Sequence, residues 1–229
     1  MKIRLLCFPS AGAGALSYRS WLSAFPADVE VIPVELPGRG ARIKEALYSD
    51  ARMLANTLIS ELASYLERPY AMFGHSVGAL LAYEVARAAK TDPIHLFVSA
   101  RHSPDYLCAA RTSHDLPDDA LCQELRSMGG MSEILLREPD IMRLLLPAIR
   151  ADLSMTETYL PDRVPFVLQC PITAYAGTND GRVLPAQMEG WSRYTSNTFR
   201  LHTMHGGHFY LQQPDCPLVS MIADSLLCS

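Results

Sequence analysis

One short segment of the 229-residue chain, Gly74-His75-Ser76-Val77-Gly78, has the residue types and spacing for nucleophilic chemistry. It follows an apolar run, 70–73, and precedes a helix-forming run, 79–87. A Gly-x-Ser-x-Gly pattern between a strand and a helix is typical of a nucleophile elbow, a sharp turn that lifts the serine hydroxyl clear of a sheet edge. Glycine suits both ends of this turn because a larger side chain would collide with the adjoining strand or helix. The segment therefore predicts a serine nucleophile, Ser76.

A serine hydroxyl is a useful nucleophile only when a base lies within hydrogen-bond reach and a third group orients that base. After a nucleophile elbow the acid and then the histidine follow in chain order, each in a loop after a strand. Asp180 follows the apolar run 171–176, His208 follows the run 197–204, and each has a glycine neighbour. We therefore expect a triad in which His208 takes and returns the proton of Ser76 while Asp180 orients the imidazole.

The triad has competing candidates: Asp105 for the acid, and His202 or His205 for the base. Asp105 follows the strand after the elbow, a place that some hydrolases use for the acid. His202 lies inside an expected strand, and His205 precedes the glycines that would permit close approach. His75 adjoins the nucleophile, but its side chain should point away from Ser76, and we interpret it as a packing residue.

A loop of small residues, 9–14, directly follows the first apolar run, 3–8. In enzymes with this elbow, such a loop supplies one backbone donor of the oxyanion hole, and the residue after the nucleophile supplies the other. By position, we expect these donors to be the N–H groups of Ala11 and Val77. The loop also contains Gly-x-Gly, but a dinucleotide site would need a third glycine where Ser17 stands.

Composition narrows the class of protein. A length of 229 residues and a hydrophobic content of 49% suit one α/β domain spanning residues 1–229, and the net charge of −4 predicts no broad basic face for nucleic acid. The six cysteines show neither C-x-x-C pairs nor metal-ligand spacing, so we expect no metal and no cofactor. No run is long enough for a signal peptide or a membrane span, which favours a cytoplasmic protein with reduced thiols.

Apolar runs and breaker residues predict alternating strands and helices. Strands are expected at 3–8, 29–34, 70–73, 94–99, 171–176 and 197–204. Helices are expected at 17–25, 49–66, 79–87, 185–194 and 214–227. Strands that alternate with helices favour a mostly parallel central sheet flanked by helices, the α/β-hydrolase fold when combined with the elbow.

Between residues 103 and 161 the strand pattern stops, and helices are expected at 118–128, 132–136 and 140–158. A helical insertion on the carboxyl side of a sheet predicts a lid over the site. Four methionines fall within it: Met128, Met131, Met142 and Met155. Methionine suits an adaptable apolar surface, although for any single one of them we favour a place in the core of the helical insertion.

These motifs and others, in order, cover nearly the whole chain. They are Cys7-Phe8-Pro9-x-Ala11-Gly12, Leu36-Pro37-Gly38-Arg39, Phe73-Gly74-His75-Ser76-x-Gly78-Ala79-Leu80, Phe97-Val98-Ser99, Leu146-Pro147-x-Ile149-Arg150-Ala151-Asp152, Glu157-x-Tyr159, Cys170-Pro171-Ile172-Thr173-Ala174 and Gly206-Gly207-His208-Phe209. In this set the chain resembles the type II thioesterases that accompany modular polyketide and nonribosomal peptide synthases, a family that includes medium-chain fatty-acyl thioesterases. It departs from the family at Ser10, usually tyrosine, and at Ala13, often glycine.

The resemblance implies hydrolysis of aberrant or stalled acyl groups from the phosphopantetheine arms of acyl or peptidyl carrier proteins, by a monomer that binds neither nucleic acid nor membrane. The alternatives are a medium-chain fatty-acyl thioesterase, a general carboxylesterase or acyltransferase, and a hydrolase fold kept as an inactive binding module. All three triad residue types are present, which argues against the last.

Carrier proteins of this kind are generally acidic, and this chain is also net acidic. Docking therefore needs a local basic patch. Loops after expected strands carry Arg39, Arg42 and Arg101 on the side where Ser76 should open. We expect Arg42 and Arg101 to contact the carrier, whereas Arg39 is a better candidate for a structural ion pair.

Overall fold

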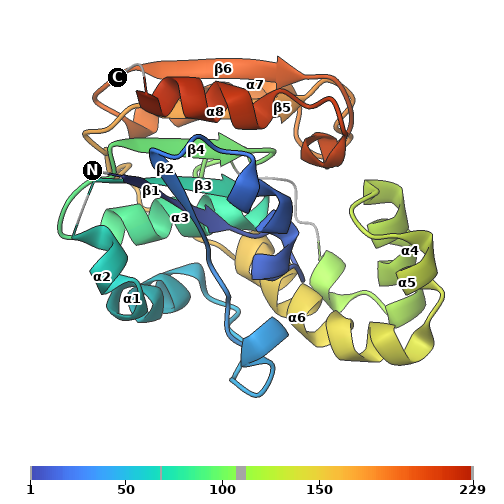
Figure 1. Cartoon of the computed structure of the whole chain (residues 1–229). Coiled ribbons are helices and arrows are strands. Elements are labelled where there is room, and N and C mark those ends of the chain that lie inside the picture. The colour runs from blue at the N-terminus through green and yellow to red at the C-terminus, as the bar shows by residue number, and fades with distance from the viewer. Residues whose placement is uncertain (1, 68, 107–111, 228–229) are drawn as a thin grey trace.

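The computed structural model describes residues 2–67, 69–106 and 112–227, which form a parallel sheet flanked by helices (Figure 1). Across the sheet, the strands are β2 (Val29–Pro33), β1 (Ile3–Phe8), β3 (Tyr70–His75), β4 (His95–Ser99), β5 (Ile172–Gly177) and β6 (Phe199–Met204). Every neighbouring pair of these strands is parallel. The predicted α/β class is confirmed.

The strand order reverses between β1 and β3, because the chain proceeds from β1 to one side of the sheet and from β3 to the other. In open parallel sheets, ligands bind beyond the carboxyl ends of the strands at such a reversal. The loop 9–14 follows β1 and the elbow follows β3. The topology alone therefore puts the two predicted halves of the oxyanion hole next to each other.

Helices cover both faces of the sheet. The α-helices in the described part of the chain are α1 (Ala51–Glu61), α2 (Ala63–Leu66), α3 (Val77–Ala88), α4 (Asp118–Met128), α5 (Glu133–Leu136), α6 (Pro139–Glu157), α7 (Pro185–Met188) and α8 (Leu218–Leu227). The 3₁₀ turns are η1 (Ala15–Ser23), η2 (Gly40–Arg42), η3 (Ser113–Asp115), η4 (Glu189–Tyr194) and η5 (Tyr210–Gln212). Alternate strand residues point to opposite faces, so one apolar cluster joins the sheet to α1, α3 and η4, and another joins it to η1 and α8.

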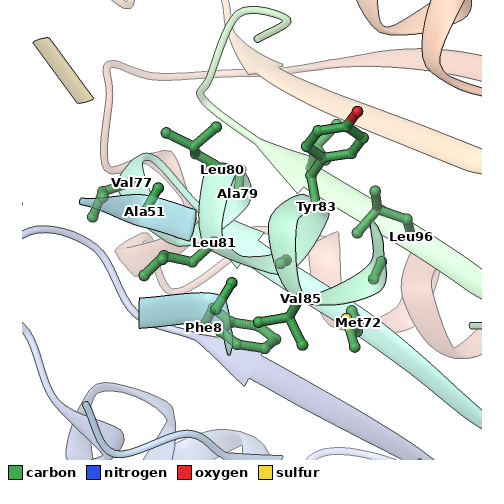
Figure 2. Close-up of a cluster of buried hydrophobic side chains, with 14 of the residues drawn as sticks. Phe8, Ala51, Met72, Val77, Ala79, Leu80, Leu81, Tyr83, Val85 and Leu96 are labelled. Atoms are coloured by element: carbon green, nitrogen blue, oxygen red, sulfur yellow. The ribbon is translucent and has the colours of Figure 1, made fainter. Parts of the chain in front are cut away.

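Helix α3 is buried from Val77 to Ala86, as expected of a helix with apolar residues on most of its sides, and Glu84 is its one buried charged residue. Figure 2 shows Leu81 and Val85 beside Phe8 of β1, with Met72 and Leu96 of the next two strands close by. This helix starts directly after Ser76, so its packing fixes the position of the nucleophile on the sheet.

The helical insert, defined here as residues 112–161, contains η3, α4, α5 and α6. Helices α4 and α5 lie away from the sheet, beyond the carboxyl ends of its strands (Figure 1). They share a small apolar cluster of their own with α6, formed by Leu121, Leu125, Leu136, Met142, Leu146, Ile149 and Leu153. Of the four predicted methionines, Met142 belongs to this cluster and Met155 to the main core, while Met128 and Met131 line the cavity described below.

Three predicted helices differ from the structure. The helix expected at 49–66 is divided at Leu62 into α1 and α2, and those at 17–25 and 185–194 contain 3₁₀ turns. Serines at 17, 20 and 23 and the glycine at 190 lower the α-helical propensity of the last two segments.

Within the described part of the chain, no helix combines the length and apolarity needed to cross a membrane. The four cysteines that the structure describes (7, 122, 170 and 216) carry free thiols, whereas Cys108 and Cys228 lie outside the described residues. Residues 107–111 of the predicted lid also lie outside them.

Candidate active site

The turn after β3 has the geometry of a nucleophile elbow. Ser76 has φ 57° and ψ −120°, a strained combination for a residue with a side chain. A Cβ atom at Gly74 would lie 2.1 Å from the carbonyl oxygen of Gly78, and one at Gly78 would lie 2.2 Å from that of Phe8. Both glycines are therefore required by close backbone contacts, and the packed helix α3 holds the serine in its strained conformation.

The structure brings Ser76, His208 and Asp180 into one hydrogen-bonded chain. His208 Nε2 lies 3.1 Å from Ser76 Oγ, and His208 Nδ1 lies 2.8 Å from Asp180 Oδ2. The side chains of His208 and Asp180 are both buried. With Nδ1–H donating to the carboxylate, Nε2 is free to accept the serine proton, which is the arrangement required for general-base activation.

Glycines hold the acid loop and the histidine loop together. A Cβ atom at Gly177 would lie only 2.4 Å from the carbonyl oxygen of Gly207. The Asn179 N–H donates to the Gly206 carbonyl at 2.8 Å. The ends of β5 and β6 thus approach backbone to backbone, which lets Asp180 reach the imidazole.

Asp180 is held as a charged acceptor. Burial alone would raise its pKa, but the hydrogen bond and charge of His208 and the N–H groups of Arg182 and Val183 outweigh burial and lower it. Those two N–H groups donate to Oδ1 at 2.8 and 3.2 Å, leaving Oδ2 for the histidine. The two oxygens therefore have separate tasks: one anchors the carboxylate and the other orients His208.

The competing candidates lie elsewhere. Asp105 Oδ2 accepts a hydrogen bond from Arg193 at 2.5 Å. His202 lies in β6 with its ring stacked on Tyr175, and His205 is exposed.

His75 is buried, with Nδ1 2.8 Å from Ser99 Oγ and its ring beside Phe209 and Tyr210. Burial, reinforced by the neighbouring charge of His208, lowers the pKa of His75 well below its ordinary value. These contacts agree with the packing role expected for this side chain.

The two predicted oxyanion donors come from the start of α3 and from the loop after β1. Val77 is the first residue of α3, so its N–H has no acceptor within the helix and belongs to the positive end of the helix dipole. Ala11 lines the same cavity as Ser76. Beside it, the Gly12 N–H donates to Asp152 Oδ2 at 2.8 Å.

Ser76 and His208 open into a cavity of about 660 Å³, within the range of small-molecule sites. The helical insert contributes an apolar wall to this cavity: Leu125, Met128, Met131, Leu135, Leu145 and Leu153. The insert also contributes polar side chains, those of Ser132, Thr156 and Glu157. A cavity that combines a serine hydroxyl with an apolar wall suits a substrate with a reactive carbonyl and a long apolar chain.

The three arginines of the predicted docking face have different environments. Arg39 is buried in an ion pair with Asp152, as expected for a structural role. Arg42 pairs with Glu45 and Glu61, and these hydrogen bonds raise its pKa further above its ordinary value. Its charge is thus largely neutralised, which makes it a poor attractor for an acidic carrier.

Arg101 is the one of the three that lines the cavity, among the residues that the structure describes. It remains our predicted carrier contact.

Sequence reasoning missed the contacts that connect the helical insert to the site. Arg182, two residues after the predicted acid, pairs with Glu124 of α4, and the Gly12 N–H of the loop after β1 donates to Asp152 of α6. The sequence could have indicated that Asp152 has a partner, though not which one, because Asp152 is a carboxylate on the buried side of α6, between Ile149 and Leu153. A buried carboxylate implies a partner.

The strand order and the elbow define an α/β-hydrolase fold, and the hydrogen bonds from Asp180 through His208 to Ser76 have the arrangement expected of a serine-hydrolase site. A family model described as "Thioesterase domain" matches residues 3–226. The chain belongs to the thioesterase family and is thus a hydrolase that acts on thioesters.

Similar proteins include members from peptide and polyketide pathways. The gramicidin S biosynthesis protein GrsT of Aneurinibacillus migulanus is 37% identical over 230 residues, which cover 98% of this chain and 89% of the relative. The solved structure of the type II thioesterase BorB from the borrelidin biosynthetic cluster has a TM-score of 0.90 and 37% identity, with 99% of this chain and 93% of that chain covered.

The human medium-chain S-acyl fatty acid synthase thioesterase is 31% identical over 225 residues, which cover 92% of this chain and 82% of the relative. The identity to GrsT and to BorB, 37% in each case, is thus higher than the identity to this fatty-acid enzyme.

Proposed function

We propose that this protein is a type II editing thioesterase. It releases aberrant or stalled acyl groups from the phosphopantetheine thiols of acyl or peptidyl carrier proteins in a polyketide or nonribosomal peptide pathway. The observation that carries the proposal is the chain Ser76–His208–Asp180 opening into an apolar-walled cavity. The similarity to GrsT and BorB supports the pathway class.

In the proposed reaction, Ser76 Oγ attacks the thioester carbonyl while His208 Nε2 takes its proton. The N–H groups of Ala11 and Val77 bind the oxyanion, and the positive end of α3 adds to their effect. His208 then returns the proton to the departing carrier thiol. Water, activated by the same histidine, hydrolyses the acyl-enzyme and restores Ser76.

The apolar wall is consistent with an acyl chain that lies along the helical insert. We propose that residues 103–161 form a lid over the site. The carrier approaches from the side where Arg101 lines the cavity. We further predict that the enzyme acts as a monomer in the cytoplasm, where carrier proteins are available to it.

The test is hydrolysis of one acyl group on three leaving groups: an acyl-carrier protein, the matching acyl-CoA, and an oxygen ester. We expect kcat/KM to be highest for the carrier-bound thioester and lowest for the oxygen ester, with no turnover by Ser76→Ala. Highest kcat/KM for medium-chain acyl-CoA would favour the fatty-acyl alternative, and preference for the oxygen ester would favour a carboxylesterase. Failure of a fluorophosphonate probe to label Ser76 would favour a binding module.

A further inference from the structure

The carboxylate of Asp152, on α6, joins two loops that are distant from it in the sequence. Its Oδ2 accepts the Gly12 N–H at 2.8 Å. The Arg39 guanidinium binds both oxygens, with Nη2 3.0 Å from Oδ1 and Nη1 against Oδ2. Asp152 is 0% exposed and Arg39 5% exposed. A fully buried carboxylate would strongly destabilise the fold if it had no partner, so the fold depends on the hydrogen bonds that this carboxylate accepts.

The loop that receives this hydrogen bond is a tight turn. The Ala13 N–H donates to the Ser10 carbonyl at 3.0 Å, and Gly12, the third residue of the turn, has φ 71°. A positive φ at that position is the mark of a type II turn, which differs from type I chiefly in the orientation of the peptide between the two central residues. That peptide, Ala11–Gly12, is the one whose N–H Asp152 accepts.

Because Gly12 has no Cβ atom, it adopts positive and negative φ with similar ease, and the Ala11–Gly12 peptide can rotate by about 180° without a steric clash at this residue. The restraint therefore has to come from outside the loop, and α6 supplies it twice. Asp152 accepts the N–H, and Ile149 lies so close that a Cβ atom at Gly12 would be 2.4 Å from its Cγ1. The N–H and C=O of a trans peptide point in opposite directions. Holding the Gly12 N–H therefore also directs the Ala11 carbonyl.

We propose that Asp152 is a positioning residue: by accepting the Gly12 N–H, it fixes the Ala11–Gly12 peptide and the type II form of the turn 10–13. It thereby holds Ala11 in place, and the N–H of Ala11, in the preceding peptide, is the proposed oxyanion donor. The inference rests on the proposed function, which assigns that N–H to the oxyanion hole. Burial raises the pKa of Asp152, and the hydrogen bonds and charge of Arg39 oppose that rise and orient the carboxylate. Leu153 and Thr156 of the same helix line the cavity, so the helix that contacts the acyl group also sets the oxyanion loop.

The test separates the hydrogen-bond acceptor from the ion pair. Arg39→Met/Asp152→Leu removes both, and exchanging a buried ion pair for apolar residues of similar size commonly preserves stability. Arg39→Met/Asp152→Asn also removes the ion pair but keeps a side-chain carbonyl that can accept the Gly12 N–H. For each variant and for wild type, kcat and KM are measured on an octanoyl thioester of N-acetylcysteamine, and Tm is measured by circular dichroism.

We expect the leucine variant to lose about 10-fold or more in kcat, with KM within about twofold. The reason is that an oxyanion donor stabilises the transition state more than the bound substrate, so its displacement lowers kcat rather than raising KM. The asparagine variant should recover most of that kcat at a similar Tm. Wild-type kcat in the leucine variant, or equal losses in both variants, would overturn the inference. Should the leucine variant not fold, Arg39→Met/Asp152→Ala makes the same comparison.

Wild-type hydrolysis of the same thioester distinguishes the two proposals. An inactive wild type would overturn the proposed function and this inference with it. An active wild type whose kcat is insensitive to the acceptor at position 152 would overturn the inference alone.

Discussion

The carboxyl edge of the sheet and the helical insert hold the two sides of the cavity in different ways. At the sheet edge, backbone contacts leave no space for a Cβ atom at Gly74, Gly78 or Gly177. The insert instead has a small apolar cluster and half-exposed ion pairs, such as Arg182–Glu124 and Arg150–Asp118. The proposed catalytic groups are thus fixed by backbone packing, whereas the proposed contacts to the acyl chain are held by side chains that can rearrange.

The largest effects should come from the fixed region. Ser76→Ala and His208→Ala should each lower kcat by about 10⁴-fold or more, and the double variant should lose little further, because these residues act as a unit. Asp180→Asn should lose a similar order, because the imidazole tautomer is no longer held. The measurement is kcat on an acyl thioester.

Asp105→Asn is the matched control for the acid, since its carboxylate pairs with Arg193. It should retain nearly full kcat. Full activity in Asp180→Asn, or loss in Asp105→Asn, would place the acid elsewhere.

Backbone exchange should separate the same two regions in solution. Amides of α4 and α5 should exchange hydrogen about 100-fold or more faster than those of β3 and α3, because few apolar contacts oppose their local opening. Hydrogen exchange read by mass spectrometry gives the comparison directly. Equal protection of both regions would contradict a mobile lid.

Acyl-chain preference should respond to the insert. Leu135 lines the cavity and is 37% exposed, whereas its neighbour Ile134 is 76% exposed and lies outside the cavity lining. Leu135→Trp should lower kcat/KM for long acyl thioesters about 10-fold by occupying the chain's space, while acetyl thioesters change little. Ile134→Trp is the matched control. The proposed acyl site would be wrong if both variants lowered kcat/KM for long chains equally.

The smallest effect concerns pH and the buried histidines of the sheet. Burial, with a lesser effect from Arg200, lowers the pKa of His95 to about 4, and its Nε2 lies 2.8 Å from Thr173 Oγ1. Between pH 6.5 and 4 the unfolded chain therefore binds more protons than the folded chain. As the pH falls through this range, His95 should lower the free energy of unfolding by about 1.4 kcal/mol per pH unit. His75 contributes with the same sign, because burial also lowers its pKa.

Urea unfolding at a series of pH values checks this slope. His95→Gln should reduce it, whereas His205→Gln, at an exposed position, should leave it unchanged. A slope that stays the same in His95→Gln would show that this histidine is not buried in its neutral form.

Local patterns made most of the architecture predictable. The strands were recognisable because buried parallel strands are continuous apolar runs. Ser76, Asp180 and His208 were recognisable as candidates because each follows such a run and has a glycine close by. The contact between Gly12 and Asp152 was not predictable, because it joins residues 140 positions apart through a geometry that only packing defines. The neutralisation of Arg42 by Glu61 was missed for the same reason.

One measurement tests the central claim most directly: rapid quenching of the enzyme mixed with a stoichiometric acyl-carrier protein, followed by proteolytic digestion and peptide mass analysis. The account predicts a transient acyl mass on the peptide that contains Ser76, appearing as the carrier loses its acyl group and decaying to free acid. His208→Ala should show neither step. Loss of the acyl group from the carrier without an adduct on Ser76, or a carrier that stays acylated in the presence of active wild-type enzyme, would contradict it.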